Sequence, residues 1–81
     1  MDYMPFARAG LSNTEIAELL DVTRHSVGNW LSGSRRPHFL LEERVSTLLD
    51  RVNAAVIDGE LPLDPSINRK ERLNRIKEII N

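Results

Sequence analysis

The side chains best suited to recognise a specific partner lie between residues 24 and 32. Arg24 carries a guanidinium that can bond both O6 and N7 of guanine, and Asn29 carries an amide that can bond N6 and N7 of adenine. His25 can donate to a guanine or a phosphate, and Ser32 offers a hydroxyl. Gly28 has no side chain, so the helix backbone can approach a DNA groove closely at that position. We expect these five residues to contact base edges; the alternative is that they are solvated helix residues.

Two further groups have the chemistry of phosphate binding. Arg35 and Arg36 follow the base-reading segment and are expected to contact the DNA backbone rather than the bases. Asn13 and Thr14 open an earlier helix, where free backbone N–H groups and the helix dipole favour an anion. The alternative for the two arginines is that they are solvated loop charges.

These residues need two short helices to hold them. Ser12 and Glu15 have the spacing of a capping box, in which each side chain bonds the other residue's backbone N–H. The apolar residues that follow recur at helical spacing and define one buried face. They are Ile16, Ala17, Leu19 and Leu20. The spacing therefore predicts a first helix from about residue 13.

The turn and the second helix follow directly. Asp21 lies at the turn and is one of the few residues other than glycine that tolerate a positive φ, and Val22 is expected to enter the core. Thr23 is a favourable N-cap for the next helix. Val27 and Trp30 share a face four and seven residues after Thr23, so we assign that face to the core. The polar residues of the first paragraph then lie on the opposite side.

This arrangement resembles the Cro/C1-type (XRE-like) helix-turn-helix family of phage and bacterial regulators. The resemblance covers roughly residues 7–50 and ends in a segment like the family's W-x-x-G-x-R-x-P exit, here Trp30 to Pro37. The other matching positions are Ile16, Ala17, Leu20, Val22 and Val27. Two features depart from the family: Asp21 replaces the common turn glycine, and only residues 2–9 remain for the preceding helix, which we expect to begin with Pro5 at N1. The resemblance implies an all-α, lambda-repressor-like helix-turn-helix bundle of about four to five helices with a C-terminal helix.

The second half of the chain predicts two more helices. Apolar residues at spacings of three and four indicate a helix over about 38–57, ended by Asp58 and Gly59. Leu49 and Val56 make its apolar stripe wider than one small unit is expected to bury. After a proline-rich link, Asp64 is the expected N-cap of a last helix with Pro65 at N1.

The last helix allows two interpretations. Leu73, Ile76 and Ile80 form an apolar stripe that we expect to mediate dimerisation; the alternative is that the helix packs on its own domain. Its basic residues, Arg69 to Lys77, are either a solvated face or a second DNA contact. The predicted organisation is therefore a DNA-binding domain over residues 1–59 and a linker with a dimerisation helix over 60–81.

Charge is unevenly distributed along the chain. The net charge is −1 from 11 basic and 12 acidic residues, which by itself does not favour nucleic acid. Residues 22–37, however, contain three arginines and no acid, whereas residues 38–65 contain six acids against two bases. DNA binding requires a local positive face rather than a net positive charge on the whole protein, so residues 22–37 are the segment whose charge favours DNA.

The sequence lacks the residue patterns of metal sites, of paired catalytic carboxylates and of phosphate-binding loops. His25 and His38 have no cysteine and no metal-ligand spacing, Glu42 and Glu43 are adjacent rather than on one helix face, and no glycine-rich phosphate loop is present. We therefore expect no enzyme, no metal and no cofactor. There is no cysteine, no apolar run near the roughly 18 residues of a membrane span and no visible signal peptide, so we expect a cytoplasmic protein without a small-molecule ligand or membrane partner.

These observations predict a sequence-specific transcriptional regulator, a repressor that binds double-stranded DNA at a pseudo-palindromic operator as a homodimer and regulates its own operon. Two recognition helices would then enter successive major grooves about 34 Å apart. The alternative is a small protein-binding inhibitor, for example of host RNA polymerase, built on the same type of fold. In that case helix 38–57, with Leu49 and Val56, would carry the contact surface.

Overall fold

A computed structural model describes residues 1–81 as five α-helices without a β-strand. The helices are α1 (Met4–Arg8), α2 (Asn13–Leu20), α3 (Arg24–Ser32), α4 (Phe39–Ile57) and α5 (Arg69–Ile80). The predicted all-α class and the predicted number of helices are confirmed. Helix α1 begins at Met4, so Pro5 is its second residue and not the expected N1 residue, although it still lies in the first turn.

The starts of α2 and α3 follow the predicted caps. The backbone N–H of Ser12 donates to Glu15 Oε1 at 2.9 Å, and the N–H of Glu15 donates to Ser12 Oγ at 3.1 Å. The backbone N–H of Ser26 donates to Thr23 Oγ1 at 3.1 Å. Each of these bonds satisfies a donor that the first turn of a helix leaves free.

Asp21 ends α2 in the left-handed conformation that its position predicts. It has φ 57° and ψ 48°. The N–H of Val22 donates to Ala17 O at 3.0 Å, and the N–H of Asp21 reaches Glu18 O at 3.4 Å, which is the bond pattern of a Schellman motif. This turn redirects the chain within three residues, so α3 starts immediately beside α2.

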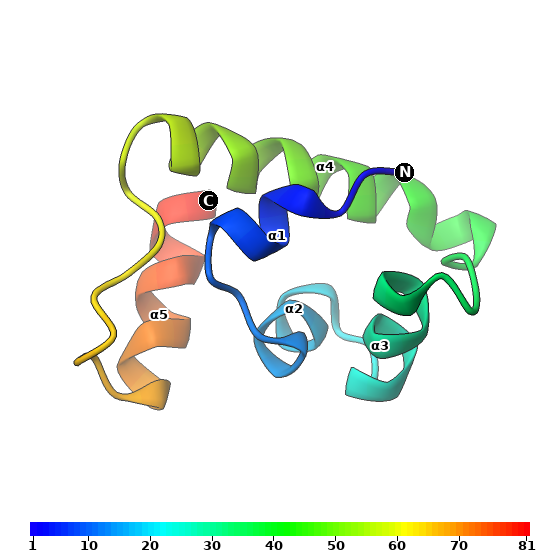
Figure 1. The fold of residues 1–81 in the computed structure, drawn as a ribbon, viewed down its shortest axis with the longest axis horizontal. Coiled ribbons are helices and arrows are strands. Elements are labelled where there is room, and N and C mark those ends of the chain that lie inside the picture. Colours follow the sequence, from blue (N-terminus) through cyan, green and yellow to red (C-terminus); the bar gives the residue numbers. More distant parts are fainter.

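The five helices surround one core (Figure 1). The long helix α4 crosses one side of the molecule, α1 packs along it, α2 packs against α3, and α5 packs against α4 at the opposite end from α3. The core comprises Phe6, Ala9, Ile16, Ala17, Leu20, Val27, Trp30, Val45, Leu48, Leu49, Val52, Ala55, Leu61, Ile76 and Ile80. Every helix contributes to it, and α3 is positioned mainly by its packing against α2.

Helix α4 occupies the predicted range but not with the predicted surplus of apolar surface. Leu49 is only 6% exposed because α1 packs along α4, and Val56 is partly buried against the core. The expectation that Leu49 broadens an unburied stripe is therefore wrong. The exposed apolar side chains of α4 lie at its ends instead: Phe39 and Leu40 are each 71% exposed, and Ile57 is 75% exposed.

Helix α5 begins later than the sequence predicted. Its N-cap is Asn68, whose side chain accepts from the N–H of Glu71 at 2.9 Å, and not Asp64. The Asp64 carboxylate instead accepts from the N–H of Ser66 at 2.9 Å, so its oxygen is used inside a local turn. Asp-Pro and Asn-x-x-Glu are both helix-start signals, and the second one is used.

Two of the three residues expected to mediate dimerisation pack inside their own chain, and the third, Leu73, is half-buried. Ile76 is fully buried and Ile80 is 8% exposed, both within the core of the same chain, and Leu61 of the connecting segment joins them. Arg51 Nη1 donates to the backbone oxygen of Ile80 at 3.0 Å and ties the end of α5 to α4. Ile76 and Ile80 thus fill the chain's own core rather than a free interface. Residues 60–81 complete the fold and are not a separate appendage.

No helix in the structure is both long enough and apolar enough to cross a membrane.

Candidate nucleic-acid interface

Helix α3 separates a buried side from a polar side. Val27 is fully buried and Trp30 is 6% exposed, whereas Arg24 and His25 are exposed. Thr23 caps the helix so that Arg24 is its first residue. The predicted burial of Trp30 and exposure of Arg24 and His25 are confirmed, whereas Gly28 and Asn29 are half-buried.

One concave surface collects residues from α3 and from the segment that follows it. We call this surface the α3 hollow; it has a volume of about 520 Å³. Its polar lining residues are His25, Ser26, Asn29, Arg35, Arg36 and His38. Two of the predicted base contacts and both predicted arginine phosphate contacts therefore lie around a single site, although up to eleven residues separate them in sequence.

Asn13 lies against the outer side of α3. A Cβ atom at Gly28 would be 3.8 Å from Asn13 Nδ2, which is an ordinary van der Waals distance. The first turn of α2 is therefore a direct neighbour of the α3 backbone. The structure brings together one predicted phosphate contact, Asn13, and one predicted close-approach position, Gly28.

Three of the predicted base contacts lie outside the α3 hollow: Gly28, which lies beside Asn13, Arg24 and Ser32. Arg24 is exposed at the start of α3 with no ion-pair partner. Ser32 lies at the other end of the helix, where its Oγ donates to Asn29 O at 3.2 Å and lies 3.0 Å from Ser34 Oγ. The Ser32 hydroxyl is thus already engaged within the chain.

Arg35 and Arg36 are exposed and form no ion pair within the chain. The backbone N–H of Arg35 donates to Asn29 O at 3.2 Å, and the next residue but one, Pro37, is buried. The short segment is therefore held at both ends while its guanidiniums stay free. Arg36 also acts on Tyr3: burial raises the pKa of the Tyr3 hydroxyl, and the positive charge of Arg36 opposes that rise.

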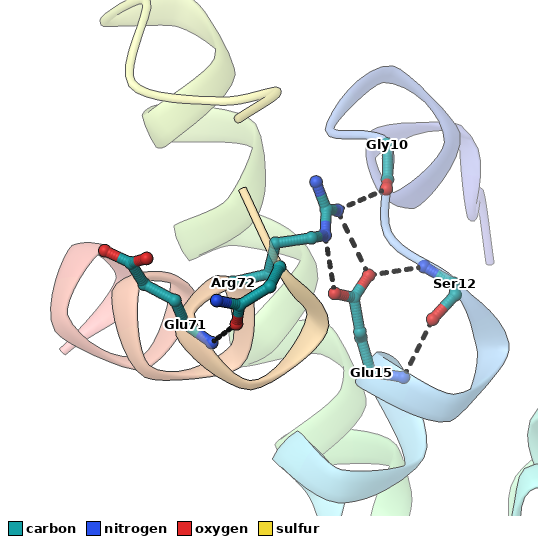
Figure 2. Close-up of polar contacts among 6 residues, drawn as sticks. Gly10, Ser12, Glu15, Glu71 and Arg72 are labelled. Carbon is teal, nitrogen blue, oxygen red and sulfur yellow. Dashed lines mark hydrogen bonds and ion pairs between the residues drawn. The ribbon is translucent and has the colours of Figure 1, made fainter. Parts of the chain in front are cut away.

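A polar cluster fixes the turn before α2 (Figure 2). Arg72 of α5 donates from Nε to Glu15 Oε2 at 3.0 Å and from Nη2 to Gly10 O at 3.1 Å. Glu15 also accepts from the N–H of Ser12, so its carboxylate joins three segments of the chain. Burial raises the pKa of Glu15, but the bonds from Arg72 and Ser12 outweigh it and hold that pKa below its usual value.

Sequence reasoning missed two residues near these surfaces. His38 lines the α3 hollow and caps α4, its Nδ1 accepting from the N–H of Leu40 at 3.2 Å. Its position between Pro37 and an amphipathic helix was a usable signal of a cap. Arg72 was read as one of several surface cations, and no local pattern links it to Glu15, which lies 57 residues earlier.

The structure contains no group of three or more His, Cys, Asp or Glu residues that could hold a metal ion. Comparisons of the chain with protein-family models, with curated proteins and with solved structures found no match. The functional argument therefore depends on the geometry of the surface around α3.

Proposed function

We propose that this chain is a sequence-specific DNA-binding protein that inserts α3 into the major groove. The observation that carries the proposal is the separation of faces on α3, with Val27 and Trp30 in the core and Arg24, His25 and Asn29 on the accessible side. An α-helix fits the major groove, and arginine and asparagine are the side chains that read guanine and adenine there.

The surroundings of α3 support DNA over an uncharged partner. Arg35 and Arg36 border the same hollow as His25 and Asn29, and neither arginine is neutralised by an acid of the chain. On the other side, Asn13 and Thr14 begin α2 beside Gly28. Phosphate groups on both flanks of a groove would meet donors on both flanks of the helix.

The same proposal covers the biological role. Two copies bind a pseudo-palindromic operator, with one recognition helix in each of two successive major grooves, and the bound dimer represses transcription, including that of its own operon. This role places the protein with the chromosome in the cytoplasm of a bacterial or phage-infected cell. It is a binding role, without enzyme chemistry, metal or cofactor.

The first experiment is selection of bound sequences from a random duplex library with purified protein, followed by sequencing. We expect an enriched inverted repeat whose half-sites lie about one helical turn apart. A variant with both Arg24 and Asn29 changed to Ala is the control, since it retains the core and should lose the enrichment. A folded protein that enriches no sequence contradicts the proposal, and an enriched single half-site contradicts the dimer.

A second candidate, a protein-binding inhibitor, is favoured by a different observation. Phe39 and Leu40 at the start of α4 are each 71% exposed, which is unusual for two adjacent large apolar residues. Leu49 is buried and Val56 is partly buried, so these two residues of α4 do not form the free surface that this hypothesis expected. If the chain acts by docking on a protein, changing Phe39 and Leu40 to Ser abolishes activity in cells and leaves DNA binding intact, whereas Arg24→Ala does not affect activity.

A further inference from the structure

We propose that Arg69, in the first turn of α5, forms an additional contact with the DNA backbone next to the start of α2. This inference rests on the proposed function, because it extends the same DNA surface by one helix. It concerns a helix that the sequence suggested for dimerisation and whose apolar face the structure places in the core.

The cations of α5 fall into two groups. Arg72 is bound to Glu15 and Arg75 is bound to Glu71, at 3.0 Å in each case. Arg69, Lys70 and Lys77 have no ion-pair partner in the structure. Only these three positive charges of α5 are therefore available to an external anion.

Arg69 is the member of this group that faces the proposed DNA surface. It lies three residues before Arg72 and seven before Ile76, so it extends the packed face of α5 by one turn. It lines an open hollow of about 330 Å³, here called the α2–α5 hollow, together with Ser12 and Thr14. The side chain of Arg69 thus lies beside the first turn of α2.

The contact between α5 and α2 is held in place by Arg72. Its bonds to Glu15 and to Gly10 O join the first turn of α5 to the turn that precedes α2 (Figure 2). Because Arg69 lies one turn before Arg72, these bonds also limit where the backbone of Arg69 can lie. Arg69 therefore meets a bound phosphate with less loss of freedom than a lysine on a free tail.

Residues from three helices then form one continuous surface. Gly28 of α3 borders Asn13, the adjacent residue Thr14 borders the α2–α5 hollow, and Arg69 borders Thr14 across it. The amino-terminal ends of α3 and α5 point to the same side of the molecule (Figure 1). A DNA strand that passes Asn13 and Thr14 while α3 occupies the groove consequently continues toward Arg69.

One acid opposes this surface. Glu18 also lines the α2–α5 hollow and forms no ion pair, whereas the charge of Glu15 is balanced by Arg72. Removing the Glu18 charge should therefore strengthen DNA binding if the backbone passes here. Glu18→Gln is thus a gain-of-affinity counterpart to the loss expected from Arg69.

The test compares single-charge variants of α5 on a mixed-sequence duplex, measured by fluorescence anisotropy over a range of salt. Arg69→Gln removes a charge at the proposed contact, whereas Lys77→Gln removes one at the far end of the same helix. Loss of one phosphate contact makes the slope of log K, the association constant, against log salt concentration less negative by about 1. It also weakens binding by about 3- to 10-fold at physiological salt. We expect both changes for Arg69→Gln and neither for Lys77→Gln.

The outcomes separate this inference from the proposed function. If the wild-type protein binds with a steep salt dependence but Arg69→Gln and Lys77→Gln behave alike, α5 does not touch DNA and the inference is overturned while α3 keeps its role. If the folded wild-type protein does not bind duplex at all, the proposed function itself fails. Tighter binding by Glu18→Gln together with weaker binding by Arg69→Gln supports the contact.

Discussion

Helices α3 and α5 are both short and amphipathic and both carry basic residues, but the structure uses their charges differently. In α3 and the segment after it, Arg24, Arg35 and Arg36 form no ion pair. In α5, Arg72 and Arg75 are paired with glutamates of the same chain. The fold thus pairs none of the cations of α3 and the segment after it, whereas in α5 it pairs two and leaves Arg69, Lys70 and Lys77 unpaired. Under the proposed function, an unpaired cation is available to DNA and a paired one supports the fold.

The largest expected effect tests whether α5 belongs to the core. Ile76→Ala removes a fully buried side chain and should lower the free energy of unfolding by about 2–5 kcal/mol, measured by chemical denaturation. Lys77→Ala, one residue later and exposed, is the matched control and should have little effect. A loss that disappears when the protein concentration is raised would indicate instead that Ile76 stabilises a dimer.

The next effect compares the two ion pairs of α5. Arg72→Ala should cost about 1.5–3 kcal/mol of stability, because it leaves the largely buried Glu15 carboxylate without its charged donor. Arg75→Ala breaks a pair whose side chains are 52% and 50% exposed and should cost less than about 0.5 kcal/mol. Equal losses would mean that the Glu15 contact is no more important than a surface pair.

The features that sequence predicted well are local ones. The Ser12 capping box, the Thr23 cap, the left-handed Asp21 and the buried Trp30 each depend on residues within about a turn, and the structure confirms all four. Such signals specify where helices start, stop and face.

What sequence did not predict depends on contacts between distant segments. The pairing of Arg72 with Glu15 spans 57 residues. The burial of Leu49 depends on α1, and that of Ile76 depends on where α5 docks. The same limit applies to the candidate site, because the residue types were evident but their grouping was not. His25 and Arg36 line one hollow although eleven residues separate them, and the backbone bond from Arg35 to Asn29 O and the burial of Pro37 hold the intervening segment.

On the α3 side, Arg24→Ala should reduce binding to the selected sequence by about 1–3 kcal/mol and relax the preference at one base pair of each half-site. Thermal stability should not change, since Arg24 is exposed and unpaired. Arg36→Ala should weaken binding to all sequences similarly and lower the salt slope by about 1. Identical behaviour of the two variants on matched and unmatched duplexes would refute the division into base and phosphate contacts.

Acid should weaken the Glu15 contact, with a smaller effect than Arg72→Ala because a protonated carboxyl still forms some hydrogen bonds. The folded-state pKa of Glu15 lies below its usual value of 4.5, so its contribution to stability is complete above that value and is lost as the pH falls through the folded-state pKa. Unfolding free energies from neutral pH to about pH 3 should fall less steeply for Glu15→Gln than for the wild type. Parallel pH profiles would show that other carboxylates account for the acid sensitivity.

The smallest expected effect concerns Gly28→Ala, a change that adds one methyl group and should affect stability and DNA binding in opposite directions. Gly28→Ala should stabilise the protein by about 0.5–1 kcal/mol, since alanine favours the helix and its Cβ would meet only Asn13 Nδ2 at 3.8 Å. If the α3 backbone approaches DNA at this position, the same methyl must reduce affinity, because it occupies the space between helix and groove. Melting temperature and duplex affinity should therefore change in opposite directions. A variant that melts higher and binds as well as the wild type would place Gly28 outside the interface and would rotate the DNA-facing side of α3 toward His25 and Asn29.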